Sequence, residues 1–162
     1  MNNRNFIIVL IAVILCIIAG TVLLTSMSTV NYERIEITPN ATMDVPSNQL
    51  KDYGDTLGVK LWKWNNGVLI TYTGSGNNST GLAGTLGLGM IKKLAGVGEV
   101  KNIDGFNVYS VGESEIPDSL KMYVKGNIYT ISIVNDDTHD NILICCQDKD
   151  VALHMAKSVQ FK

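Results

Sequence analysis

Hydrophobic residues are distributed along this chain in two different ways. Residues 6–24, from Phe6 to Leu24, are apolar and carry no charge, whereas the rest of the chain mixes apolar and polar positions. A helix over this run would be about 28 Å long, close to the thickness of the hydrocarbon core of a bilayer. Backbone groups in lipid must bond to one another, so a helix is the expected state. The pattern predicts a transmembrane anchor over residues 6–25, a linker over 26–31 and a domain over 32–162.

The charges that flank the apolar segment predict its orientation. Arg4 is the only charged residue before it, and the next charges along the chain are Glu33 and Arg34. By the positive-inside rule, residues 1–5 would lie in the cytoplasm and the domain outside it, on a single-pass cell-membrane anchor. A cleaved signal peptide is the alternative, because residues 26–28 (Ser-Met-Ser) have the small residues of a cleavage site.

Small residues recur at four-residue spacing within the apolar segment. Ala12, Cys16 and Gly20 would share one face of a helix. Small side chains let two membrane helices approach closely, so this face predicts a helix-packing seam in a homodimer. Chance recurrence is the alternative, because small residues are common in membrane helices.

In the domain, runs of β-branched and aromatic residues meet at turn-forming dipeptides. Asn66-Gly67 and Asp104-Gly105 suit type I′ turns, in which both central residues have positive φ, and Gly126-Asn127 suits a type II′ turn. The hairpins predicted in this way pair residues 59–64 with 67–72, 99–103 with 106–111, and 120–125 with 128–134.

The remaining pattern predicts two more strands and two helices. The strands cover residues 32–38 and 141–147, with a loop over 39–53 after the first. Apolar residues at four-residue spacing predict helices over 80–94 and 149–160, the second capped by Asp148. Together these elements predict an α+β domain, with a largely antiparallel sheet of hairpins and two packed helices, preceded by one transmembrane helix.

Charge and cysteine content exclude some classes of protein. The net charge is −2, from 13 basic and 15 acidic residues, whereas a nucleic-acid binder needs a concentrated basic face. We therefore expect no nucleic-acid partner. Cys145 and Cys146 are adjacent, and neighbours on a strand point to opposite faces, so they are poorly placed to form a disulfide with each other.

Three aromatic residues are candidates for ligand binding. Trp62 and Trp64 are two residues apart and share one face of their predicted strand, and Tyr72 lies on the partner strand. If that face is exposed, the side chains form a platform for a sugar or a protein. If it is covered, they belong to the hydrophobic core.

An acidic turn and a glycine-rich stretch are candidates for metal and nucleotide binding. Asp136, Asp137 and Asp140 could supply oxygen ligands to calcium, although the spacing is not that of an EF-hand, and a solvated turn is the alternative. Residues 81–89 are rich in glycine, but the Lys-Ser/Thr of a P-loop does not follow. We expect no cofactor.

Two asparagines lie in sequons for N-glycosylation. Asn40 and Asn78 both fall in predicted loops, and the domain is predicted to face outward. The sequence predicts modification at these positions, with chance occurrence of the triplets as the alternative.

The pattern of the domain resembles that of small membrane-anchored proteins of methanogenic archaea. The resemblance rests on the N-terminal anchor, the Trp62-x-Trp64-Asn65-Asn66-Gly67 hairpin and a C-terminal set of residues, and it carries over no catalytic residue. The layout of elements is also similar to PsbP-like and Mog1-like domains, at the level of fold alone. The C-terminal residues that carry the resemblance are Gly126, Asn127, Tyr129, Ile131, Ile133, Asp148, Ala152, Met155, Ser158 and Phe161.

Three functions fit these observations. The first is a non-enzymatic interaction module, anchored at the cell surface, that binds a protein through the surface around Trp62, Trp64 and Tyr72. The second is an accessory subunit of a membrane complex that assembles through the Ala12/Cys16/Gly20 face. The third is an envelope-associated hydrolase or metal-dependent enzyme, whose carboxylates would have to converge from separate parts of the chain.

Overall fold

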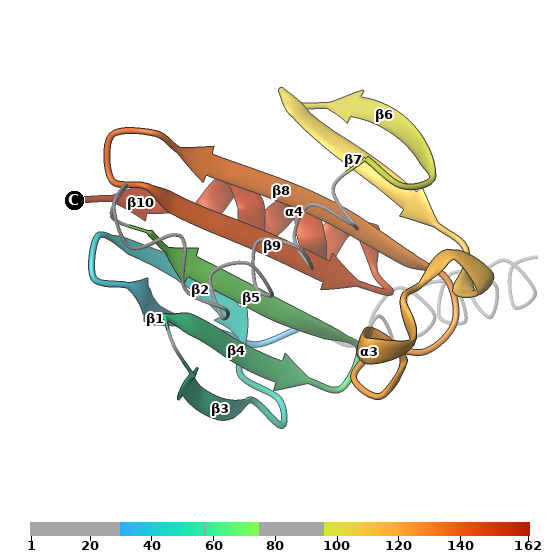
Figure 1. Cartoon of the computed structure of the whole chain (residues 1–162), viewed down its shortest axis with the longest axis horizontal. Coiled ribbons are helices and arrows are strands. Elements are labelled where there is room, and N and C mark those ends of the chain that lie inside the picture. The colour runs from blue at the N-terminus through green and yellow to red at the C-terminus, as the bar shows by residue number, and fades with distance from the viewer. Residues whose placement is uncertain (1–29, 57, 75–95) are drawn as a thin grey trace, which may run out of the picture. The chain divides into compact units, whose positions relative to one another are not determined.

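The computed structural model describes residues 30–56, 58–74 and 96–162, and Asn31–Lys162 form one compact unit. Strands hold 54% of the described residues and form two antiparallel sheets (Figure 1). No helix within these three ranges is long and apolar enough to cross a membrane. The predicted anchor over residues 6–25, with Ala12, Cys16 and Gly20, and the predicted helix over 80–94 lie outside the described residues.

The smaller sheet has the order β1-β2-β10, with β1 (Tyr32–Thr38), β2 (Ala41–Pro46) and β10 (Gln160–Phe161). The prediction of β1 is confirmed, but the prediction of a loop over residues 39–53 is wrong. Ala41, Met43 and Val45 are buried, whereas Thr42 and Asp44 are partly exposed. This two-residue period is typical of a strand. Pro39 lies just before β2 and Pro46 is its last residue, and a proline at the end of a strand removes little pairing.

The larger sheet has seven strands in the order β3-β4-β5-β9-β8-β7-β6, and all neighbours are antiparallel. Its strands are β3 (Lys51–Thr56), β4 (Val59–Trp64), β5 (Gly67–Thr73), β6 (Glu99–Ile103), β7 (Phe106–Val111), β8 (Ile128–Asn135) and β9 (Asp140–Cys146).

Two of the three predicted hairpins form. Asp104 and Gly105 join β6 to β7 and have φ values of 53° and 89°, as a type I′ turn requires. Between β4 and β5, Trp64 pairs with Gly67, so the loop consists of Asn65 and Asn66 rather than Asn66 and Gly67. Glycine is required at position 67 because there is no room there for a side chain. A Cβ atom there would lie 2.6 Å from the Cys145 carbonyl oxygen and closer still to the Trp64 indole.

The third predicted hairpin is wrong on its first strand. Residues Asp118–Lys121 form the single turn α3, which follows a 3-10 turn, η1 (Glu113–Glu115), and β8 pairs with β7 and β9 instead. Ile116, Leu120 and Val124 are buried at four-residue spacing. Leu120 lies in this turn and Ile116 and Val124 flank it, and all three pack in the core cluster on the larger sheet, so their burial outweighs the β propensity of the segment.

The predicted α+β class with two packed helices is also wrong, because strands dominate the described residues. In this part of the chain, the one helix longer than a single turn is α4 (Lys149–Ser158). As predicted, the Asp148 side chain caps it, accepting hydrogen bonds from the backbone N–H groups of Asp150 and Val151 at 2.8 and 3.2 Å. Its inward stripe includes Ala152 and Met155.

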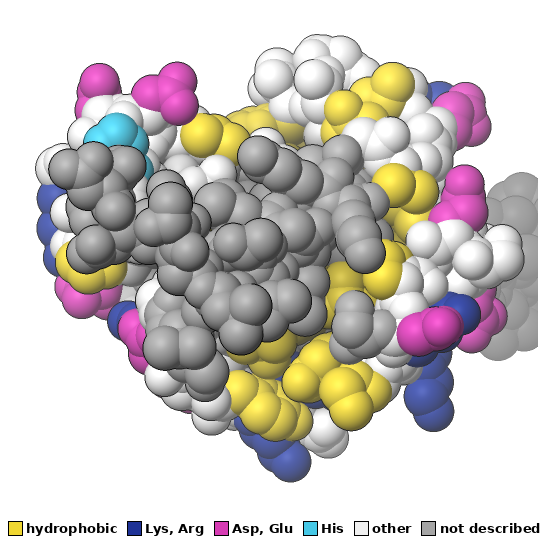
Figure 2. Space-filling model, viewed as in Figure 1, with side chains coloured by type: hydrophobic (Ala, Val, Ile, Leu, Met, Phe, Trp, Pro, Cys, Tyr) yellow, Lys and Arg dark blue, Asp and Glu magenta, His cyan; other side chains and the backbone are white. Residues whose placement is uncertain are grey.

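The two faces of the larger sheet carry different coverings. One face, which we call the α4 face, bears Trp62, Leu69 and Ile144, and it packs against α4 and the smaller sheet, both of which lie behind the larger sheet in Figure 1. The other, which we call the α3 face, bears Val68 and Ile70 in one core cluster with residues of the α3 segment. Figure 2 shows the molecule from the α3 face.

Candidate functional site

The aromatic residues predicted to bind a ligand are all buried. Trp62 and Trp64 are each 4% exposed and Tyr72 is 5% exposed. They also do not share a surface, because Trp62 pairs with Leu69 on the α4 face, whereas Tyr72 pairs with Val59 and points to the α3 face. These side chains form core on both sides of the sheet, not an exposed platform.

The two adjacent cysteines point to opposite faces, as predicted. Both are free and buried. Burial, with a smaller contribution from the neighbouring Cys146, raises the pKa of the Cys145 thiol to about 12. Burial also raises the pKa of Cys146 to about 11. A thiol with such a pKa is protonated at neutral pH and is therefore a poor nucleophile.

Cys145 and Cys146 are accordingly expected to resist alkylation in the folded protein. Iodoacetamide at pH 8 should modify less than about a tenth of either thiol in the time that gives complete reaction in denaturant. The measurement is peptide-resolved mass spectrometry, which separates Cys16 from this pair. Since both folded-state pKa values exceed the unfolded value of about 8.5, the free energy of unfolding should also fall as the pH rises above about 9. Rapid labelling of the native protein would contradict the burial of this strand.

The three carboxylates proposed for calcium do not converge. Asp136 and Asp137 are exposed in the β8–β9 turn, whereas Asp140 is fully buried at the start of β9. The Asp140 oxygens accept hydrogen bonds from the hydroxyl groups of Thr73 and Thr138, each at 2.6 Å. Across residues 30–56, 58–74 and 96–162, no group of three or more His, Cys, Asp or Glu side chains could hold a metal ion.

Of the two predicted glycosylation sites, one can be placed. Asn40 is partly exposed in the turn between β1 and β2, and its carbonyl accepts a hydrogen bond from the Lys162 backbone at 2.8 Å. Thr42, the third residue of its sequon, lies in β2 and its hydroxyl accepts from Arg34. Asn78 lies outside the described residues.

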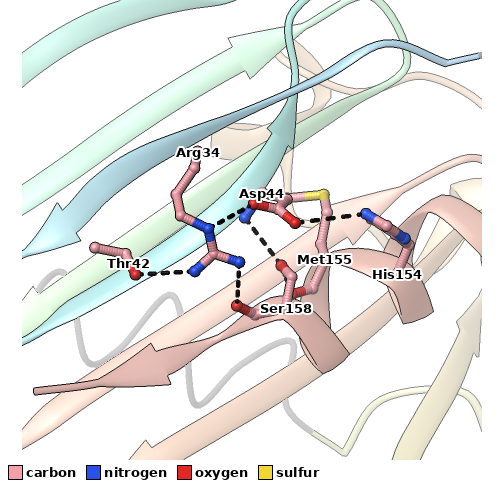
Figure 3. A network of polar contacts seen from close by, with 6 residues as sticks. All are labelled: Arg34, Thr42, Asp44, His154, Met155 and Ser158. Atoms are coloured by element: carbon pink, nitrogen blue, oxygen red, sulfur yellow. Dashed lines mark hydrogen bonds and ion pairs between the residues drawn. The ribbon is translucent and has the colours of Figure 1, made fainter.

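A polar network that sequence reasoning missed joins the smaller sheet to the end of α4 (Figure 3). Arg34 on β1 stands opposite Asp44 on β2, and its Nε lies 2.9 Å from the Asp44 carboxylate. Its other nitrogens donate to the Thr42 hydroxyl at 3.1 Å and to the Ser158 carbonyl at 3.2 Å. A guanidinium complements the partial negative charge of a helix C-terminus, so Arg34 holds β1, β2 and α4 together.

This network contains a serine, a histidine and an aspartate, but in a structural arrangement. The Ser158 hydroxyl donates to the Met155 carbonyl at 2.7 Å and accepts from the Asp44 backbone at 2.9 Å. His154 lies 3.9 Å from the Asp44 carboxylate and stacks on Tyr32, with ring centroids 4.0 Å apart. The hydroxyl proton therefore points to a backbone carbonyl, whereas a catalytic triad requires it to point to the histidine.

A hollow of about 250 Å³ lies where the β4–β5 loop meets the segment after α3. We call it the Lys63–Lys125 hollow. Figure 2 shows apolar, cationic and acidic side chains along the margins of this face. The hollow is lined by Lys63, Asn65, Asn66, Met122, Tyr123, Val124, Lys125 and Gln147.

The surface around this hollow is apolar as well as basic. Met122 is 72% exposed and Tyr53, on the edge strand β3, is 52% exposed. Tyr53 packs edge-on against Tyr123, with ring centroids 6.0 Å apart. Sequence reasoning missed this site, because its walls come from three segments distant in the chain.

Comparison with known proteins found no relative of this chain. No family model, curated protein or solved structure matches the chain.

Proposed function

We propose that this protein is a membrane-anchored module that binds a protein partner outside the cytoplasm. The observation that carries the proposal is the exposed apolar surface formed by Met122 and Tyr53 beside the Lys63–Lys125 hollow. Large apolar side chains grouped around a concavity are typical of interaction sites. The apolar segment over residues 6–25 supports the anchored location, with the domain on the outer side.

Photo-crosslinking in the producing cell tests this proposal. A photoreactive residue is placed singly at the exposed apolar positions, and the light-dependent products are separated by mass. We expect a discrete protein adduct from at least one position. The absence of any adduct from all of them would overturn the proposal. The positions are Tyr53, Val100, Met122, Val134 and Phe161.

A further inference from the structure

Three lysines gather at one end of the α3 face without a carboxylate partner. Lys51 on β3 stands directly opposite Lys63 on β4, and Lys63 and Lys125 both line the hollow. Within the described part of the chain, none of the three lies within ion-pair distance of a carboxylate. Like charges placed directly across two strands destabilise the pair, and an anion bound between them would relieve that repulsion.

The walls of the hollow hold it open in a defined shape. The Gln147 backbone N–H donates to the Asn66 carbonyl at 2.9 Å, and the Gln147 side-chain amide donates to the Lys125 carbonyl. These bonds tie the β4–β5 loop and the segment after α3 to the end of β9. A site that is already shaped before binding loses little conformational entropy when its ligand arrives.

The chemistry of the lining is that of a hydrogen-bond donor set beside an apolar wall. Lys63 and Lys125 supply ammonium groups, and Asn65 and Asn66 supply side-chain amides. No acidic residue is among the described residues that line the hollow. Met122, Tyr123 and Val124 form the apolar side.

We propose that the Lys63–Lys125 hollow binds an acidic segment of the partner protein, with carboxylates against the two lysines and a neighbouring apolar side chain against Met122 and Tyr123. This inference deepens the proposed function and rests on it. A volume of about 250 Å³ accepts one or two side chains. An anionic bilayer would also attract the lysines, but it is flat on this scale and does not enter a concave site.

The test uses the full chain in a neutral detergent and short fluorescent peptides in which Phe, Leu or Met is flanked by glutamates. Matched peptides carry glutamine in place of each glutamate. Fluorescence anisotropy measures Kd at about 50 mM and about 300 mM NaCl, because screening weakens contacts between exposed charges. Vesicles of phosphatidylcholine with about 30% phosphatidylglycerol provide the membrane alternative.

Two variants and one control locate the binding. The first variant combines Lys63→Gln with Lys125→Gln, and the second is Met122→Ser. Lys101→Gln is the control, because this lysine lies on β6 with its side chain 72% exposed. Circular dichroism melts check that all three remain folded.

We expect glutamate peptides to bind at least ten-fold more tightly than glutamine peptides, a difference of about 1.4 kcal/mol. The double lysine variant should lose that preference, Met122→Ser should weaken both peptides, and the control should change Kd less than about two-fold. The inference would be overturned if the two peptide types bound equally or if neither bound. It would also be overturned if the double lysine variant kept the preference for glutamate and Met122→Ser bound both peptides as tightly as the native protein. Binding to the anionic vesicles alone would assign the lysines to the membrane surface instead.

The crosslinking experiment separates failure of this inference from failure of the proposed function. An adduct from Val100 or Val134, together with none from Met122, would leave a binding module whose partner sits elsewhere. An adduct from Met122 that survives the double lysine variant would retain the surface and reject the acidic ligand.

Discussion

Replacing Trp64 with alanine is expected to lower the free energy of unfolding by about 3–5 kcal/mol. The indole is 4% exposed and covers Gly67, where no Cβ could be accommodated. Its removal would leave a cavity over Gly67 that neighbouring side chains can fill only in part. Urea unfolding of the full chain in neutral detergent, followed by circular dichroism, measures the change.

The matched control is Tyr53→Ala, which removes an aromatic side chain that is 52% exposed. Its edge-on contact with Tyr123 limits the expected loss to about 0.5–1.5 kcal/mol. The comparison tests whether Trp64 belongs to the core or to an exposed binding platform. Alanine at a platform residue would abolish ligand binding but would leave the free energy of unfolding nearly unchanged. A loss below about 1 kcal/mol for Trp64→Ala would mean that the tryptophan face is not packed as described.

Replacing Asp140 with alanine is expected to cost about 2–3 kcal/mol of unfolding free energy. This carboxyl group is fully buried and accepts two hydrogen bonds of 2.6 Å, from Thr73 on β5 and from Thr138 in the β8–β9 turn. Its loss would leave both hydroxyl groups without their acceptor and would loosen the turn. Chemical denaturation with the same protocol gives the value.

Asp137→Ala provides the comparison for this residue, because Asp137 is exposed in the same turn and should change stability by less than about 0.5 kcal/mol. Added calcium should stabilise neither the native protein nor the Asp137 variant if the carboxylates serve only the fold. A calcium-dependent rise in the midpoint of unfolding that disappears with Asp137→Ala would instead restore the metal-site hypothesis.

Features that depend on near neighbours in the chain were predictable from the sequence. The strand over residues 32–38, the Asp104-Gly105 turn and the Asp148 cap each follow from local backbone preferences, and the structure confirms them. The placement of Tyr72 was also predictable, although it was missed. In a hairpin with a two-residue loop, every even-numbered residue on one strand pairs with an odd-numbered residue on the other, and paired residues share a face. Trp62 and Tyr72 both have even numbers, so they must point to opposite faces of the sheet.

Only the tertiary structure decided which surfaces are covered and which are open. Burial of both tryptophans depends on α4, β1 and β2 packing on one face of the sheet, and a strand pattern does not record which face receives a covering. The Lys63–Lys125 hollow exists because the β4–β5 loop, the segment after α3 and Gln147 meet in space. The spacing of hydrophobic residues in the sequence indicates which side of a helix or strand is buried. A concave site forms only when the fold brings several elements together, so that spacing does not predict it.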